Sequence, residues 1–144
     1  MQKSKLIILF LALFISISCL SREFSARELA AKNIVDAVNA KDSEMYVKDL
    51  ADDVVVTMYN GKVILEGLKA VKENRTKHFD LYPDARNELV HIVQIDDRVV
   101  MHDLVWLSQE QSEPADIVEI FTFKGSTITQ IDVIQSQNLN IKRD

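Results

Sequence analysis

Hydrophobic residues recur at helical spacing in the first third of the chain and alternate with polar residues over much of the second half. Between residues 26 and 40 the apolar side chains fall three or four positions apart, which predicts a helix over that range. A short second helix is expected to begin near Glu44, because Asp42 or Ser43 can cap its N-terminus. Its buried side would hold Met45, Tyr46, Val47, Leu50 and Ala51.

The rest of the pattern is typical of strands with one more helix. β-branched and aromatic residues predict a strand over 54–59 and a partner over 62–65, joined by a hairpin turn at Asn60-Gly61. A third helix is expected from Gly67 to about Phe79. After the turn at Tyr82-Pro83-Asp84, an antiparallel meander is predicted, with strands over 86–95, 98–107, 116–123 and 127–134. This order predicts an α+β fold: a cone-shaped α+β barrel in which three N-terminal helices pack on a curved, mainly antiparallel sheet and enclose a pocket.

The first nineteen residues have the pattern of an export signal. Two lysines precede Leu6–Ser18, a thirteen-residue apolar run that is shorter than the roughly 20 residues needed to cross a bilayer. The run ends at Cys19, and this boundary resembles the lipobox of bacterial lipoproteins, in which the cysteine is lipidated. A lipoprotein signal, an ordinary cleaved signal and an uncleaved anchor all fit the run, and the lone cysteine at its end favours the first.

The expected organisation is therefore a signal over 1–19, a tether over 20–25, one domain over 26–136 and a polar tail over 137–144. An exported, membrane-anchored lipoprotein is predicted, with a soluble periplasmic or secreted protein as the alternative.

Composition excludes several classes of function. The chain has 144 residues, 17 Lys+Arg and 22 Asp+Glu, and this net charge of −5 argues against nucleic-acid binding. One cysteine leaves no internal disulfide and no cysteine-rich zinc site. Phosphate-binding glycine loops are absent from the sequence, and a metal site would need three or four converging ligands. We expect no metal and no other cofactor.

Several short stretches, taken in order, resemble the nuclear transport factor 2-like superfamily and within it the SnoaL-like and ketosteroid-isomerase-like branch. The matching stretches are 38–42, 50–54, 61–70, 82–84, 96–102, 118–125 and 131–133. The resemblance spans about residues 26–136. It implies the cone-shaped fold described above and, as in many members of the superfamily, a homodimer.

The resemblance also marks candidate site residues. In ketosteroid isomerases a carboxylate near the end of the first strand removes the proton, and a first-helix tyrosine and a protonated acid form the oxyanion hole. Met58 and Ile34 stand where the base and the tyrosine would be, and Glu119 stands where the acid would be, so steroid isomerisation by that mechanism is not expected. Similarity to SnoaL-like cyclases points to Asp132, seven residues after Gly125, and to His102.

We expect Asp132, His102 and Glu119 to form a catalytic cluster in the pocket, with Asp132 as base. The expected pocket lining is Ile34, Met58, Val100, Trp106, Ile117, Phe121, Gln130 and Ile134. Structural interpretations stay open: a register slip by one residue would turn Glu119 outward, His102 could be a core histidine, and Asp132 could pair with surface lysines. Trp106 and Phe121 fit a pocket wall or a dimer contact better than a specific ligand contact, and His78 and His91 look like surface residues.

Three functions follow as hypotheses. The first is a tethered module that binds a small apolar molecule. The second is a SnoaL-like isomerase, cyclase or hydrolase that acts on a carbonyl compound through Asp132 and His102. The third is a dimeric interaction module, in which Val99, Met101 and Val105 supply an apolar dimer face.

Overall fold

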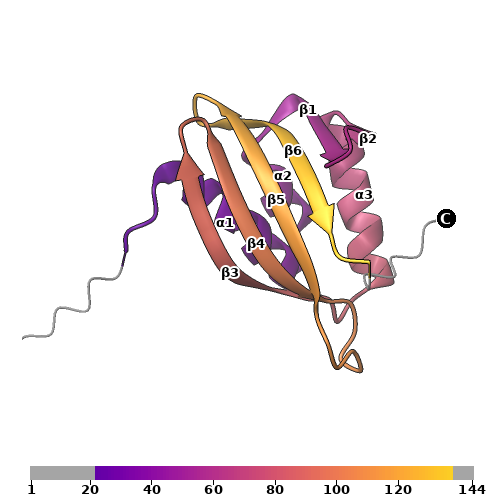
Figure 1. The fold of residues 1–144 in the computed structure, drawn as a ribbon. Coiled ribbons are helices and arrows are strands. Elements are labelled where there is room, and N and C mark those ends of the chain that lie inside the picture. Colours follow the sequence, from indigo (N-terminus) through magenta and orange to yellow (C-terminus); the bar gives the residue numbers. More distant parts are fainter. Residues whose placement is uncertain (1–21, 138–144) are drawn as a thin grey trace, which may run out of the picture.

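The chain forms three helices packed against one face of a six-stranded sheet (Figure 1). The structure is a computed structural model, and it describes residues 22–137. The helices are α1 (Ala26–Ala40), α2 (Ser43–Val47) and α3 (Leu68–Leu81). The strands are β1 (Leu50–Met58), β2 (Val63–Glu66), β3 (Arg86–Ile95), β4 (Arg98–Trp106), β5 (Ala115–Lys124) and β6 (Thr127–Gln135). The predicted α+β class and element order are confirmed. The predicted export signal over 1–19, with Cys19, and residues 138–144 of the tail lie outside the described residues.

Local sequence accounts for where the helices begin and end. Ser25 caps α1 through a capping box with Glu28, whose side chain bonds back to the Ser25 backbone N–H. Lys41 ends α1 in the left-handed conformation, with φ 57°. Asp42 caps α2 by accepting from the Met45 N–H, and Gly67 precedes α3 with φ 88°, a value that suits glycine.

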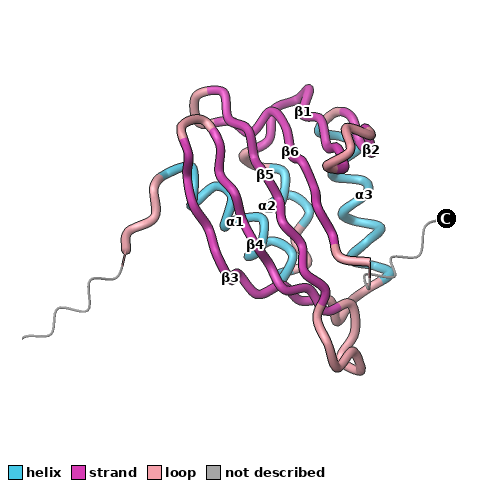
Figure 2. Tube along the Cα trace, viewed as in Figure 1, coloured by secondary structure: helices cyan, strands magenta, loops and turns pink. Residues whose placement is uncertain are grey.

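The sheet has the strand order β2-β1-β6-β5-β4-β3, so the last strand inserts beside the first. The β1–β6 pair is parallel and every other pair is antiparallel. Figure 2 shows the meander β3–β6 crossing one side of the molecule with α1 and α2 behind it and α3 beyond β6. One face of the sheet, here called the inner face, is covered by the helices.

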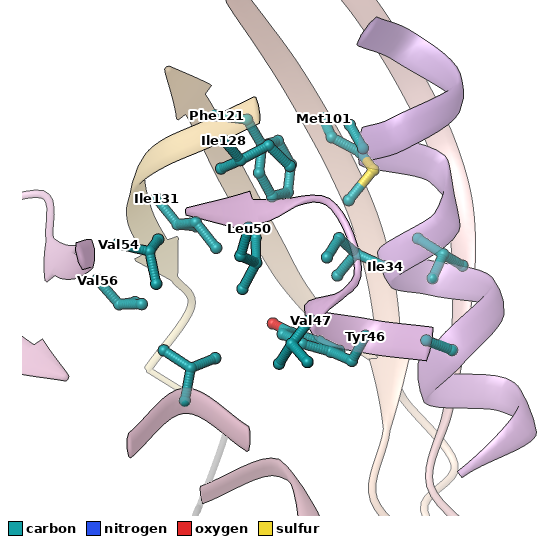
Figure 3. Close-up of a cluster of buried hydrophobic side chains, with 14 of the residues drawn as sticks. Ile34, Tyr46, Val47, Leu50, Val54, Val56, Met101, Phe121, Ile128 and Ile131 are labelled. Carbon is teal, nitrogen blue, oxygen red and sulfur yellow. The ribbon is translucent and has the colours of Figure 1, made fainter. Parts of the chain in front are cut away.

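The hydrophobic core lies between the inner face and the helices. Phe121, Val99 and Ile128 are completely buried there, and Met101 is 1% exposed. Figure 3 shows Ile34 and Tyr46 reaching this core from α1 and α2, opposite Met101 and Phe121 of the sheet. Val99, Met101 and Val105 are therefore core residues. The prediction that they form an apolar dimer face is wrong, because the helices cover the face on which they lie.

None of the helices formed by residues 22–137 is both long enough and apolar enough to span a bilayer.

Candidate functional site

A small cavity lies between the three helices and the β3–β5 part of the inner face. Its volume is about 70 Å³. Each helix contributes to its wall, and so do three neighbouring strands. The lining residues are Ile34, Val38, Tyr46, Arg75, His78, Asn87, Val105, Leu107, Ile117 and Glu119. Half of them are aliphatic and the other half carry a polar or charged group, so the cavity combines an apolar wall with convergent polar groups, as small-molecule sites commonly do.

Glu119 reaches the cavity because of its register in β5. It stands opposite Met101 of β4 and Val133 of β6, and residues directly opposite each other share a face of the sheet. Met101 is buried in the core, so the Glu119 side chain also points inward. Within residues 22–137 the Glu119 carboxyl makes no hydrogen bond and no ion pair. The carboxyl is thus a polar group in the cavity wall that can form a hydrogen bond with a bound molecule.

Burial determines the protonation state of Glu119. Loss of hydration and, to a lesser extent, the nearby Asp103 raise its pKa to about 8, against the opposing effect of Arg75. At neutral pH the side chain is therefore mostly the neutral acid. A neutral carboxylic acid has one O–H that can donate and oxygen lone pairs that can accept.

Asp103 lies behind the cavity wall on the inner face of β4. It is 1% exposed, and its Oδ2 accepts from Asn87 Nδ2 at 3.3 Å. Its Oδ1 is buried without a hydrogen-bond partner. Burial raises the Asp103 pKa to about 6, against the opposing effects of Asn87 and His102.

Helices α2 and α3 contribute three more polar lining residues, Tyr46, Arg75 and His78, and β3 contributes Asn87. The Arg75 guanidinium carbon lies 5.5 Å from the centre of the Tyr46 ring, which is cation–π geometry. Burial raises the pKa of Tyr46 to about 12, so the phenol keeps its proton. Burial, with Arg75 and Lys41, lowers the pKa of His78 to about 4, so this imidazole is neutral at pH 7.

The predicted catalytic cluster does not assemble in the cavity, because His102 and Asp132 lie on the outer face of the sheet. His102 pairs with Val118, one position from the inward-facing Met101, and Asp132 pairs with Ile120. His102 Nε2 lies 2.8 Å from Asp116 Oδ1, and Asp132 bonds to Thr57 and Gln130. The expectation that these two residues meet Glu119 in one hollow is wrong; only Glu119 points inward.

The expected lining is corrected in the same way. Ile34 and Ile117 do line the cavity. Val100, Trp106, Gln130 and Ile134 lie on the outer face, where Trp106 stacks 3.5 Å from the guanidinium carbon of Arg86. Phe121 faces inward but is completely buried in the core, and Met58 pairs with Val133 without lining the cavity.

Sequence reasoning missed Arg75, His78, Asn87 and Asp103. His78 was expected at the surface, but it lies one turn after Arg75 on the side of α3 that faces the cavity. The sequence does mark Asp103. Every second residue of β4 is buried, and Asp103 is the one acid in a series that otherwise holds Val99, Met101 and Val105. A single buried acid in such a strand indicates a functional or strained position.

No three or more His, Cys, Asp or Glu side chains in residues 22–137 are grouped as they would be around a metal ion.

Comparisons with known proteins define the class of this domain. The family model of the SnoaL-like domain matches residues 31–131, and the chain belongs to this family. A search of curated proteins finds no match.

Solved structures of similar shape support the same fold. An uncharacterized cystatin-fold protein from Novosphingobium aromaticivorans is 27% identical, with TM-score 0.69 over 78% of this chain and 99% of that one. A nuclear transport factor 2-like protein of unknown function from Cytophaga hutchinsonii is 11% identical, with TM-score 0.61 over 81% and 95%. A candidate SnoaL-like polyketide cyclase from Jannaschia is 11% identical, with TM-score 0.65 over 80% and 91%. The fold is thus nuclear transport factor 2-like, with the sheet curved but not closed into a barrel.

Proposed function

We propose that the domain binds a small molecule in the inner-face cavity, with the apolar body of the ligand against the aliphatic wall and a ligand oxygen hydrogen-bonded to Glu119. The observation that carries this proposal is the Glu119 carboxyl itself, which lies in the cavity without a partner among residues 22–137. Its pKa of about 8 keeps it protonated at neutral pH. A protonated acid in an apolar site can donate to a carbonyl or hydroxyl oxygen.

The size of the cavity limits the ligand. At about 70 Å³, it is far smaller than the roughly 300–1,000 Å³ of pockets that hold drug-sized compounds. A molecule of a few carbon atoms fits this space, whereas a steroid does not. The ligand is therefore small as well as largely apolar.

Binding is favoured over catalysis by what the cavity contains. Met58 and Ile34, which stand at the positions of the base and the tyrosine in ketosteroid isomerases, cannot exchange a proton. The alternative enzyme acts through Asp132 and His102, and both of these side chains are on the opposite face of the sheet from the cavity. Of the three residues that the sequence marked as catalytic, only Glu119 lines the cavity, where its protonated acid can donate a hydrogen bond to a bound carbonyl.

The location of the protein is a separate proposal. The apolar run at residues 6–18 and the cysteine that follows it support export and tethering through a lipidated Cys19. The intact mass of the N-terminus of the mature protein tests this. A diacylated peptide beginning at Cys19 is expected, and an unmodified mature N-terminus or a retained residue 1 would contradict it. Homodimer formation stays a prediction, for which the mass in solution is the test.

Two variants on adjacent positions of β5 test the binding proposal. Ile117→Trp fills the cavity from the inner face, whereas Val118→Trp adds the same bulk on the outer face. The mature protein is titrated with 2-butanone, and backbone amide shifts are recorded by NMR. We expect saturable shifts around the cavity in the wild type and in Val118→Trp but not in Ile117→Trp. Equal shifts in both variants, or none in the wild type, would overturn the proposal.

A further inference from the structure

We propose that the ligand of this cavity is a short-chain carboxylate, whose carboxylate group is bound by Arg75 and whose hydrocarbon chain occupies the aliphatic part of the cavity. This inference rests on the proposed function and specifies the class of ligand. It is carried by the position of Arg75, a cation that lines the cavity without a carboxylate partner in the part of the chain that the structure describes.

The contacts of Arg75 leave its charge uncompensated. Its Nε donates to Asn74 Oδ1 at 3.2 Å, and its Nη2 donates to the same amide oxygen. It also lies over the Tyr46 ring. Both partners are neutral, and none of the ion pairs formed within residues 22–137 includes Arg75. An arginine is always charged in proteins and binds carboxylates through a planar fork of donors.

None of the other lining residues forms an ion pair with this cation, although Arg75 lowers the pKa of Glu119. Glu119 is mostly the neutral acid at pH 7, and His78 and Tyr46 are neutral there as well. Arg75 is therefore the only group that is mostly charged at neutral pH among the ten lining residues. A chamber whose lining carries one positive charge favours a monoanion over a neutral molecule or a cation.

The distribution of charge around the cavity also predicts the orientation of the bound carboxylate. Asp103 lies behind the β4 wall and disfavours negative charge at that side of the cavity. Arg75 belongs to α3 and lies over Tyr46 of α2. The carboxylate is thus expected beside α3, and the chain is expected to extend toward Ile34, Val105 and Ile117. From β5, Glu119 can donate to the nearer carboxylate oxygen or to a keto or hydroxy oxygen on the chain.

The test compares small molecules that each have four carbon atoms but differ in charge. Sodium butyrate, butyramide and 2-butanone are titrated into the mature protein at pH 7, and dissociation constants are obtained from amide shifts of cavity residues. Because charge-assisted hydrogen bonds are about twice as strong as neutral ones, butyrate should bind about tenfold more tightly than butyramide. Arg75→Gln should remove this preference without preventing the binding of 2-butanone.

Two control variants separate charge from folding. Lys77→Gln removes one positive charge from the exposed side of the same helix, and it should leave the preference for butyrate unchanged. Arg75→Lys keeps the charge but loses the planar fork, so an intermediate preference is expected. The thermal midpoint of each variant shows whether it is folded.

The outcomes distinguish this inference from the function on which it rests. If 2-butanone binds in the cavity and butyrate binds no more tightly than butyramide, the carboxylate inference is overturned and the binding function stands. The inference is also overturned if Arg75→Gln retains the preference or if Lys77→Gln abolishes it. If none of the three probes shifts cavity residues in the wild type, both proposals are overturned.

Discussion

Asp103 and Glu119 are diagonal neighbours on the inner face of the sheet, because Asp103 stands opposite Ile117 and Glu119 stands opposite Met101. Asp103 is buried and Glu119 lines the cavity, and the charge of Asp103 raises the pKa of Glu119. Two acids so close together do not both ionise readily. Asp103, with its pKa of about 6, carries the negative charge at pH 7, and Glu119, with its pKa of about 8, keeps the proton.

Stability should fall as pH rises through the pKa of Glu119. The folded-state pKa of about 8 lies above the ordinary value of 4.5, so the folded protein binds more protons than the unfolded chain between these values. The stabilisation is complete below the unfolded pKa and is lost as pH rises through the folded one. Between pH 6.5 and 9 we expect the free energy of unfolding to decrease by about 2 kcal/mol, measured by urea denaturation.

Glu119→Gln is the control for this pH dependence, because glutamine does not titrate. The variant should show an almost flat profile between pH 6.5 and 9. Below this window, Asp103 lowers stability as pH rises through about 6, while His78, whose pKa is lowered to about 4, has the opposite effect. A wild-type profile parallel to that of Glu119→Gln would show that Glu119 is not the titrating group.

Asp103→Asn should stabilise the protein at pH 8. The wild-type side chain is ionised at that pH and buried, and its Oδ1 has no hydrogen-bond partner. Asparagine removes the charge and keeps an oxygen for the bond from Asn87. We expect a gain of about 1–3 kcal/mol in the free energy of unfolding. Asp116→Asn, on the exposed outer face, should change stability by no more than about 0.5 kcal/mol. A clear loss of stability in Asp103→Asn would contradict this account of the cavity.

The sequence was sufficient to predict the element order, because each element has a local signal. The helix over 26–40 has apolar residues at helical spacing and is preceded by Ser25, which can cap it. In the strands after residue 85, apolar and polar residues alternate, and turns such as Asp96-Asp97 separate the strands. The parallel pairing of β1 with β6 has no such signal. It joins residues more than 70 positions apart, and it arises from how the curved sheet packs on the helices.

The orientation of the strand side chains was harder to predict. In β4 the residues at His102 and Asp103 alternate between faces, and apolar neighbours flank both: Val100 and Leu104 on one side, Met101 and Val105 on the other. With two apolar faces, the period of two does not indicate which one is covered. The resemblance favoured His102, whereas the helices cover the face of Asp103. The contribution of Arg75 depends on tertiary packing of α3, which no local pattern shows.

Ser25→Ala should destabilise the domain, because it removes the N-cap of α1. The Ser25 hydroxyl accepts from the Glu28 N–H at 3.1 Å and donates to Gln94 Oε1 of β3 at 2.6 Å. Loss of an N-cap costs about 1 kcal/mol, and the second bond adds to this cost. The expected decrease in the free energy of unfolding is about 1–2 kcal/mol. Ser112→Ala, at an exposed loop position, provides the matched control and should be close to neutral.

His102→Gln and Asp132→Asn should leave ligand binding in the cavity unchanged. Both side chains project from the outer face, where His102 contacts Asp116 and Asp132 bonds to Thr57 and Gln130. The sheet separates them from Glu119, so neither can touch a molecule in the cavity. Asp132→Asn should still cost about 1 kcal/mol of stability, because a charge-assisted hydrogen bond becomes a neutral one. The measurement is the 2-butanone dissociation constant of each variant beside that of Glu119→Leu, which has no donor and should bind severalfold more weakly than the wild type. If His102→Gln or Asp132→Asn weakens binding as much as Glu119→Leu does, the ligand does not occupy the inner-face cavity.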